Sequence, residues 1–287
     1  MSAAPTRIAY FPGCAMKDQA RPYEEGALAA LAALGVEVLE LPRWNCCGTV
    51  YSLSQDDLMR HVGPVRNLVR AQTMGEPRLL TLCAMCYATL ARSERFVREP
   101  ERLARINAFM DDEPDYLGGV RVVHLLELLR DEIGFQALAA KTVRSLDGLR
   151  VAPYYGCTLL RPRAIGVDDP DMPTVMEDLA AALGATPVPF AERGECCGSF
   201  LTATSPEVVQ ERTGRILASA RAAGAELIVT SCPLCQYNLG AHRPPAMPET
   251  PMVYLGELLA WALIEGACVP EPLRSLPAAD ACMGASA

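Results

Sequence analysis

Ten of the twelve cysteines in this chain of 287 residues fall into two sets with the same spacing. Each set contains a single cysteine, then a Cys-Cys-Gly sequence, then a Cys-x-x-Cys sequence. The sets are Cys14, Cys46, Cys47, Cys83 and Cys86, and Cys157, Cys196, Cys197, Cys232 and Cys235. Two matched sets of five indicate an internal duplication. Cys268 and Cys282 lie outside the pattern, and we expect them to have no part in a site.

Five thiols that converge on one place allow three kinds of site. Zinc takes four ligands, and the adjacent cysteines of each set point apart on an extended backbone, which suits a larger cluster better than a single ion. A redox dithiol of the thioredoxin kind leaves three thiols of each set without a role. An iron-sulfur cluster is therefore the best match, and zinc remains the alternative, above all in the N-terminal half.

The segments between the cysteines predict the elements that position them. Short hydrophobic segments before the cysteines predict buried strands, and Ala/Leu-rich segments between them predict helices. The predicted strands cover 7–11, 36–41, 78–82, 150–155, 186–190 and 227–230. The predicted helices cover 23–34, 58–74, 175–183 and 206–223, with two more that begin near Tyr87 and Gln236.

This alternation predicts an α/β fold with two tandem, duplicated domains, 1–145 and 146–287, each with a mainly parallel sheet. The carboxyl ends of parallel strands meet at one edge of a sheet, so the five thiols of each half are expected to converge there. Gly48 and Gly198 fit this picture, because glycine allows a close approach of the backbone to a bulky group. We expect the two sites to lie at the crevice between the domains.

The composition excludes other functions. The net charge is −8, with 26 Lys and Arg against 34 Asp and Glu and no basic run, so no nucleic-acid partner is expected. The longest apolar stretches, 27–34 and 258–264, are far shorter than the ~20 residues of a membrane span. The N-terminus has no secretory signal, which predicts a cytoplasmic location, where many cysteines serve metal binding or redox chemistry.

Four motifs resemble the cysteine-rich CCG-domain family, and specifically the B subunit of heterodisulfide reductase. They are Trp44-Asn-Cys-Cys-Gly48, Cys83-Ala-Met-Cys86-Tyr87, Glu195-Cys-Cys-Gly198-Ser199 and Cys232-Pro-Leu-Cys235-Gln-Tyr-Asn238-Leu239. The resemblance implies that each five-cysteine set holds a noncubane 4Fe-4S cluster. It also implies that the two clusters face each other across an active site at which a disulfide is split.

The resemblance implies an oxidoreductase acting on sulfur groups, namely the catalytic iron-sulfur subunit of a complex that reduces or forms a disulfide or organosulfur bond. The alternative is a non-catalytic electron-transfer subunit of a lactate, glycolate or succinate-type oxidoreductase, since the family includes such proteins. The implied substrate is a disulfide or a lipoyl or dithiolane-type sulfur carrier.

The sequence has no dinucleotide-binding motif, so it needs partners that supply electrons. The expected partners are an iron-sulfur protein similar to the C subunit of heterodisulfide reductase and a flavoprotein similar to the A subunit of the same enzyme.

Several other residues have two interpretations. The histidines, His61, His124 and His242, are candidates for proton donors, but His124 lies in an apolar run and is expected to form a buried hydrogen bond instead. Lys17 follows the first cysteine of one set, and Arg161 and Arg163 follow the first cysteine of the other. These cations either bind an anion or lie in a solvated loop. Trp44 is expected to pack beside the first cluster.

Overall fold

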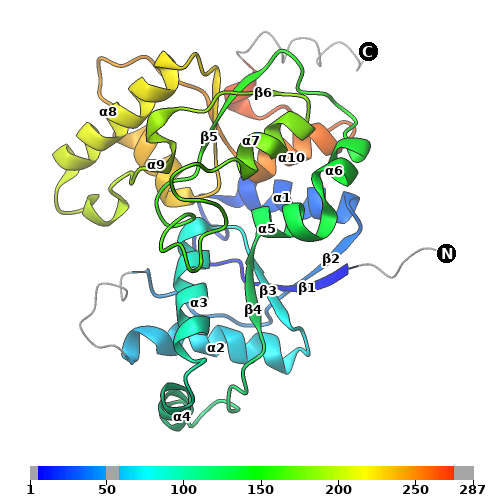
Figure 1. Ribbon diagram of the computed structural model, residues 1–287, viewed down its shortest axis with the longest axis vertical. Coiled ribbons are helices and arrows are strands. Elements are labelled where there is room, and N and C mark those ends of the chain that lie inside the picture. Colours follow the sequence, from blue (N-terminus) through cyan, green and yellow to red (C-terminus); the bar gives the residue numbers. More distant parts are fainter. Residues whose placement is uncertain (1–5, 50–57, 275–287) are drawn as a thin grey trace.

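Each half of the chain is built on a four-stranded parallel sheet (Figure 1). The computed structural model describes residues 6–49 and 58–274. In the first sheet the order is β2-β1-β3-β4, and in the second it is β6-β5-β7-β8. The strands are β1 (Thr6–Tyr10), β2 (Val36–Glu40), β3 (Arg78–Thr81), β4 (Arg121–His124), β5 (Arg150–Tyr154), β6 (Thr186–Pro187), β7 (Leu227–Thr230) and β8 (Met252–Tyr254). The predicted duplicated α/β fold with parallel sheets is confirmed.

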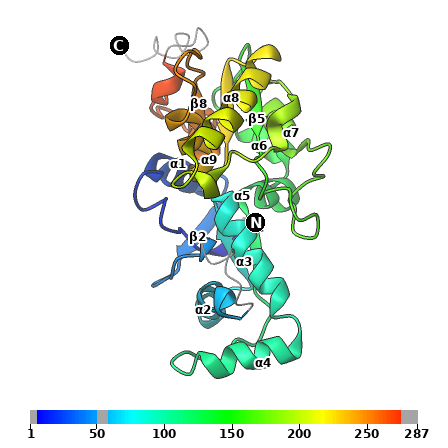
Figure 2. The same ribbon diagram turned by 90° about the vertical axis from the view of Figure 1, so that its left-hand side faces the viewer.

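Helices alternate with these strands. The helices of the first half are α1 (Arg21–Ala33), α2 (Met59–Thr73), α3 (Ala84–Phe96), α4 (Pro100–Phe109), α5 (Leu125–Glu127), a π-helical continuation (Leu128–Ile133) and α6 (Phe135–Lys141). Those of the second half are α7 (Val175–Ala182), α8 (Pro206–Ala222), α9 (Pro233–Ala241) and α10 (Leu255–Leu263), with 3-10 turns at Ala191–Gly194, Ser199–Leu201 and Glu271–Leu273. Figure 2 shows the two halves stacked along the long axis, with α4 at the end farthest from the second half.

The fourth strand of each sheet was not predicted. β4 and β8 are only four and three residues long, and each runs without a turn into the helix that follows. A glutamate in the first turn of that helix bonds back to the strand: Glu127 accepts from His124 N, and Glu257 accepts from Tyr254 N, both at 2.9 Å. A short apolar strand that continues directly into an apolar helix has no boundary that the sequence pattern can mark.

Three predicted boundaries were wrong. β6 ends at Pro187 rather than at residue 190, because Pro187 and Pro189 have no N–H for the ladder and the strand lies at the edge of its sheet. The helices after the Cys-x-x-Cys sequences begin at Ala84 and Pro233, three residues earlier than expected. Cys83 and Cys232 are therefore the extended residues that precede each helix, and proline is well suited to the first helical position.

The halves meet where α1 packs against α10, and the two helices lie side by side in Figure 1. Two glycines face each other at this contact. A Cβ on Gly26 would lie 2.5 Å from Gly256 O, and a Cβ on Gly256 would lie 2.3 Å from Tyr23 O. Beside them the rings of Tyr23 and Tyr254 stack at 5.0 Å. The absence of side chains at both glycines is what allows the two backbones to approach so closely.

We expect Gly256→Ala to destabilise the protein by about 1–3 kcal/mol, because the new methyl group meets backbone atoms of α1 that have no room to move. Gly240→Ala in α9 is the matched control, since a Cβ there would approach only Met252 Cε, at 3.9 Å. That change should be neutral or stabilising by up to ~1 kcal/mol. Denaturant titration of both variants measures the difference, and equal stabilities would contradict the close-packing argument.

Candidate functional site

The five cysteines of the first set surround one cavity of about 580 Å³. They come from the segments that follow β1, β2 and β3, as expected for a parallel sheet, and Cys86 lies in the first turn of α3. Cys14 and Cys46 are exposed, whereas Cys47, Cys83 and Cys86 are buried. The set therefore has two thiols at the surface and three in the interior.

The second set has the same arrangement. Cys157 and Cys196 are half-buried, and Cys197, Cys232 and Cys235 are buried. Cys197 Sγ lies 3.5 Å from Cys235 Sγ. Thiol hydrogen bonds also join Cys157 to Cys196 and Cys232 to Cys235, so each thiol of the set contacts another.

The two sets come together where the halves meet. Ala84 N, next to Cys83 of the first set, donates to Ser231 O, next to Cys232 of the second, at 3.1 Å, and each of these two cysteines shifts the pKa of the other. Pro233 and Leu234, from the second Cys-x-x-Cys sequence, line the cavity of the first set. The two cysteine sets are therefore neighbours, with the Cys-x-x-Cys sequences as their point of contact.

Hydrogen bonds between thiols favour the thiolate at particular cysteines. In the first set, hydrogen bonds from Cys46 and Cys86 lower the pKa of Cys47 well below its usual range, and the pKa of Cys46 is raised mainly because it donates to Cys47. A thiolate is the form of cysteine that ligates metals. Of the thiols of the first set, Cys47 is therefore the one whose buried thiolate form is most favoured by its neighbours.

Two thiols of the second set are affected in the same way. A hydrogen bond from Cys157 lowers the pKa of Cys196 to about 6. Hydrogen bonds from Cys235 and Cys83 lower the pKa of Cys232 well below its usual range. Since Cys83 belongs to the first set, the charge state of one set is coupled to that of the other.

Glycines bring the loop of the first cysteine close to the last thiol of the same set. A Cβ on Gly13 would lie 3.0 Å from Cys86 Sγ, and a Cβ on Gly156 would lie 3.2 Å from Cys235 Sγ. Both residues also have positive φ angles, 74° and 66°. A side chain at either position would occupy the space next to the thiols.

Two buried asparagines hold the Cys-Cys-Gly loops in place. Asn67 of α2 exchanges hydrogen bonds with the backbone of Asn45, accepting from its N–H at 2.9 Å and donating to its carbonyl at 3.0 Å. Asn238 of α9 donates to Cys197 O at 3.2 Å and accepts from Thr202 Oγ1 at 3.0 Å. Asn67 was not predicted from the sequence. The available clue was an amide among the apolar positions Val65, Leu68 and Val69, where a buried polar side chain needs hydrogen-bond partners.

The carbonyl of Leu82, directly before Cys83, accepts two side-chain hydrogen bonds. Tyr23 Oη donates to it at 2.7 Å, and His124 Nε2 lies 3.0 Å from it. His124 Nδ1 accepts from Leu126 N, so its proton is on Nε2, which donates to Leu82 O. The prediction that His124 forms a buried hydrogen bond is confirmed, and the contact fixes the backbone at Cys83.

We expect His124 to make the protein sensitive to acid. Burial lowers the pKa of His124 to about 4, from about 6.5 in an unfolded chain. The unfolded chain therefore takes up a proton first, and stability that is fully present above pH 6.5 is lost as the pH falls toward 4. The loss reaches about 3 kcal/mol. The difference in unfolding free energy between the native protein and His124→Gln, measured from pH 7 to pH 4.5, should shrink accordingly, and a difference that stays constant over this range would contradict the prediction.

The other candidates are engaged elsewhere. Lys17 pairs with Glu24 and Glu40, so its charge is already balanced within the chain. Arg161 donates to two backbone carbonyls, and Arg163 pairs with Asp169 and Asp171. These contacts favour the interpretation of the three cations as loop residues over the interpretation as anion ligands.

The remaining aromatic and thiol candidates lie outside the cavity lining. The Trp44 ring packs edge-on against Phe11 at 5.8 Å. His242 packs edge-on against Tyr237, and His61 bonds to Ser93. No histidine is among the described residues that line the cysteine cavity. Cys268 is exposed and Cys282 lies outside the described residues.

Residues 6–49 and 58–274 contain no group of three cysteine, histidine or carboxylate side chains placed to hold a single metal ion. Within the same residues, no helix is both long enough and apolar enough to cross a bilayer.

Comparison with known proteins gives two kinds of relative. The sequence profile named CCG, cysteine-rich domain, matches residues 8–91 and again residues 151–240. The chain is 32% identical, over 89% of its length and 92% of the other, to the 8-methylmenaquinol:fumarate reductase membrane anchor subunit of Wolinella succinogenes. It is 30% identical, over 82% of its length and 80% of the other, to the B subunit of the ferredoxin/F420H2-dependent CoB-CoM heterodisulfide reductase of Methanosarcina acetivorans.

One solved structure has a similar fold. It is a hypothetical protein from Helicobacter pylori, with a TM-score of 0.71 and 14% sequence identity. The match covers 91% of this chain and 49% of that protein, so this chain spans about half of its length. At this identity the similarity concerns the fold alone.

Proposed function

Because the chain belongs to the family of cysteine-rich CCG-domain proteins, we propose that it is an iron-sulfur subunit of a heterodisulfide reductase-like oxidoreductase complex. The observation that carries this proposal is the meeting of two matched five-cysteine sets, where Ala84 N donates to Ser231 O and where Pro233 and Leu234 line the cavity of the first set. A site duplicated in this way offers two redox centres side by side. The boundary between the two domains, 1–145 and 146–287, is part of the proposal.

The first set fits a group of several atoms. Its cavity of about 580 Å³ is many times the ~30 Å³ share of one water molecule, and five thiols face it. Gly13 leaves space beside Cys86, and Gly156 leaves the equivalent space beside Cys235. Cys14, Cys46, Cys47, Cys83 and Cys86 would hold one noncubane 4Fe-4S cluster, and Cys157, Cys196, Cys197, Cys232 and Cys235 the other. When bound, such clusters supply one-electron redox chemistry.

The residues of the chain prepare the site for this chemistry. Hydrogen bonds from neighbouring thiols lower the pKa of Cys47 and of Cys232, which favours the thiolate form that ligates a metal. Asn67 and Asn238 fix the loops of the adjacent cysteines. Met59 and Leu234 line the cavity and are partly exposed, so its mouth is apolar and suits the hydrocarbon part of an organic disulfide.

We propose that the reaction is the reduction or formation of a disulfide or organosulfur bond. Reduction breaks one S–S bond, takes up two electrons and two protons and releases two thiols, so two one-electron centres match its stoichiometry. A disulfide or a lipoyl or dithiolane-type carrier is the proposed substrate. The electrons would pass, in the cytoplasm, between this protein and two partners that resemble the C and A subunits of heterodisulfide reductase, an iron-sulfur protein and a flavoprotein.

A second candidate is a non-catalytic electron-transfer subunit in a fumarate or succinate-type oxidoreductase complex. It is favoured by the Wolinella relative, whose name includes a fumarate reductase and which aligns with 89% of this chain. This candidate uses the same cysteines and the same clusters. Unlike the disulfide-reducing subunit, an electron-transfer subunit would bind no sulfur substrate where the two cysteine sets meet.

Spectroscopy of the anaerobically purified protein separates the two candidates. In the disulfide-reducing subunit, added organic disulfide or dithiolane should change the EPR spectra of both clusters, because the two sets adjoin each other at Cys83 and Cys232. A thioether of the same shape, which has no S–S bond, is the control. Spectra that do not change with the disulfide would favour the electron-transfer subunit.

A further inference from the structure

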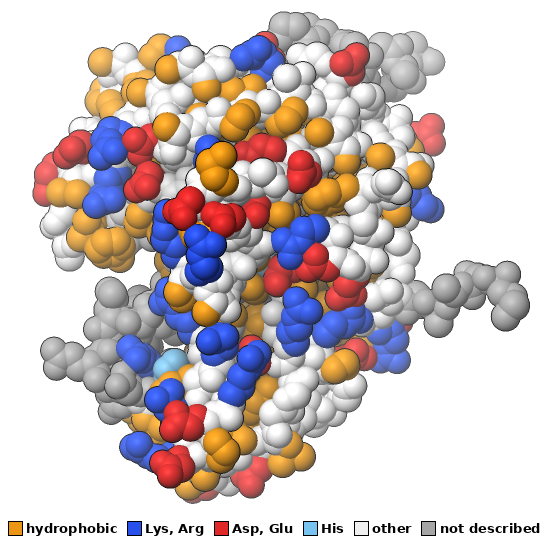
Figure 3. Space-filling model, viewed as in Figure 1, with side chains coloured by type: hydrophobic (Ala, Val, Ile, Leu, Met, Phe, Trp, Pro, Cys, Tyr) orange, Lys and Arg blue, Asp and Glu red, His pale blue; other side chains and the backbone are white. Residues whose placement is uncertain are grey.

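Four arginines line a second cavity, of about 410 Å³, between α2, α3 and α4. Arg60 comes from α2, Arg92 and Arg95 come from α3, and Arg102 comes from α4. No aspartate or glutamate is among the described residues that line it. Figure 3 shows Lys and Arg side chains gathered on the lower part of the molecule, over these helices. In a chain with a net charge of −8, this concentration of positive charge is unusual.

The floor of this arginine pocket is held by contacts among its own residues. Ser93 Oγ donates to Thr89 O at 3.0 Å, so it accepts from His61 Nδ1, 2.8 Å away. The His61 ring stacks on Phe96 at 4.0 Å, and the Arg102 guanidinium lies 4.6 Å from the centre of the same Phe96 ring. Such a floor is rigid before any ligand arrives, which lowers the entropic cost of binding.

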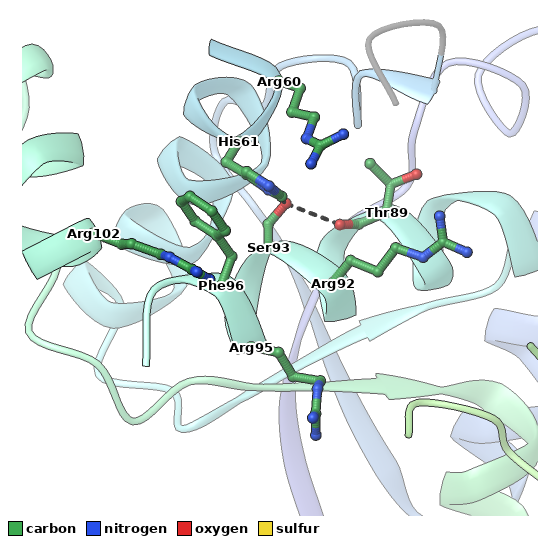
Figure 4. A pocket seen from close by; sticks show the side chains of 8 residues that line it. All are labelled: Arg60, His61, Thr89, Arg92, Ser93, Arg95, Phe96 and Arg102. Carbon is green, nitrogen blue, oxygen red and sulfur yellow. Dashed lines mark hydrogen bonds between the residues drawn. The ribbon is translucent and has the colours of Figure 1, made fainter. Parts of the chain in front are cut away.

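The guanidinium groups surround this floor. Figure 4 shows Arg60 and Arg92 reaching out on either side of Thr89, while Arg102 lies beside Phe96 and Arg95 points away from the group. Of these, Arg102 pairs with Glu99 at 2.8 Å. Within residues 6–49 and 58–274, Arg92 and Arg95 pair with no acidic side chain, whereas the neighbouring Arg98 pairs with Glu94 at 2.7 Å. Arg92 is therefore a cation at the pocket that has no acidic partner among the described residues.

We propose that the arginine pocket binds the phosphate group of a small molecule. Guanidinium groups match the oxygens of a phosphate in pairs, and several of them around one cavity favour a dianion over a single carboxylate. A volume of about 410 Å³ lies in the range of small-molecule sites. Among the described residues that line it, there is no carboxylate that would repel a phosphate.

The arginine pocket adjoins the cysteine cavity. Arg60 lines both cavities. Along α3, Met85 lines the cysteine cavity, and Thr89 and Arg92 line the arginine pocket one and two turns further on. A phosphate held by Arg92 thus lies beside the cysteine site without touching a cysteine. The proposal is independent of the group that the cysteines hold.

Calorimetry of the full-length protein tests the proposal, with pyrophosphate as the soluble probe and sodium chloride at equal ionic strength in every sample. The variant Arg92→Gln should weaken pyrophosphate binding about tenfold or more, since a charge-assisted bond to phosphate is lost. Arg105→Gln is the matched control, because Arg105 is an exposed arginine on α4 outside the pocket. The melting temperatures of both variants establish that they fold.

A lipid headgroup is the other source of the same phosphate, and flotation with vesicles of phosphatidylglycerol or phosphatidylcholine separates the two sources. Pyrophosphate binding that depends on Arg92 and not on Arg105 supports a soluble ligand. Flotation with phosphatidylglycerol alone, with the same dependence, supports a lipid phosphate. If neither probe binds, or if both variants weaken binding equally, the proposal is wrong.

Discussion

Replacing Cys47 by serine should remove about half of the iron of the protein. Two complete five-cysteine sets predict about eight iron atoms and as many sulfides per chain for two 4Fe-4S clusters. Cys47 is a buried cysteine of the first set, and the second set has its own cysteines in the other half of the chain. Anaerobically purified Cys47→Ser should therefore keep about four iron atoms. Cys197→Ser should also keep about four iron atoms, with the cluster of the second set lost instead of the first.

Cys268→Ala is the control for this experiment, because Cys268 is exposed and outside both sets. Its iron content should equal that of the unaltered protein. Iron, acid-labile sulfide and zinc are measured together on each preparation. Two zinc ions per chain without sulfide, or an equal loss of iron in Cys268→Ala, would contradict the assignment of the ligands.

Loss of either cluster should abolish disulfide reduction rather than halve it. Cleavage of an S–S bond takes two electrons, and one centre that transfers a single electron leaves the reaction incomplete. The two sets adjoin each other through Cys83 and Cys232, so both can face one substrate. We expect Cys47→Ser and Cys197→Ser each to lower the rate of disulfide reduction at least 100-fold, about 3 kcal/mol of activation free energy.

The assay uses the protein with its electron-donating partner or with a reduced artificial donor. Gly240→Ala, which leaves the cysteines untouched and has room for its methyl group, serves as the control for general effects of substitution. A variant with one cluster that still reduces the disulfide at a substantial rate would contradict the paired arrangement. It would favour the electron-transfer candidate instead.

The sequence predicts strands at the centre of each sheet well because they are short hydrophobic segments that end just before a cysteine motif. The predicted ranges 78–82 and 227–230 lie within one residue of the observed strands Arg78–Thr81 and Leu227–Thr230. The convergence of the thiols also follows from the carboxyl ends of parallel strands. The short strands β4 and β8 could not be predicted, since three or four apolar residues that continue into a helix have no turn before it.

Contacts between segments far apart in the sequence could not be predicted from the sequence pattern. Gly26 and Gly256 stand 230 positions apart, and a glycine in a helix gives no indication of which backbone lies against it. The arginine pocket was missed for a similar reason. Its cations are spread from Arg60 to Arg102 over three helices, so no basic run marks them. Between residues 92 and 105, however, an arginine recurs every three or four residues. This helical spacing was the available sign of a basic surface.

The packing of α1 against α10 also affects the nascent chain, because the ribosome makes α1 long before α10. Tyr23, Ala27 and Leu31 of α1 are buried, and α10, which packs on this helix, begins 222 residues after α1 ends. At ~5–20 residues per second, a ribosome takes roughly 10–45 seconds to make the intervening chain. Until then α1 lacks its cover, and the emerging N-terminal half exposes an apolar helix face together with unligated thiols. Protection of the nascent chain from oxidation and aggregation is therefore a requirement of this fold.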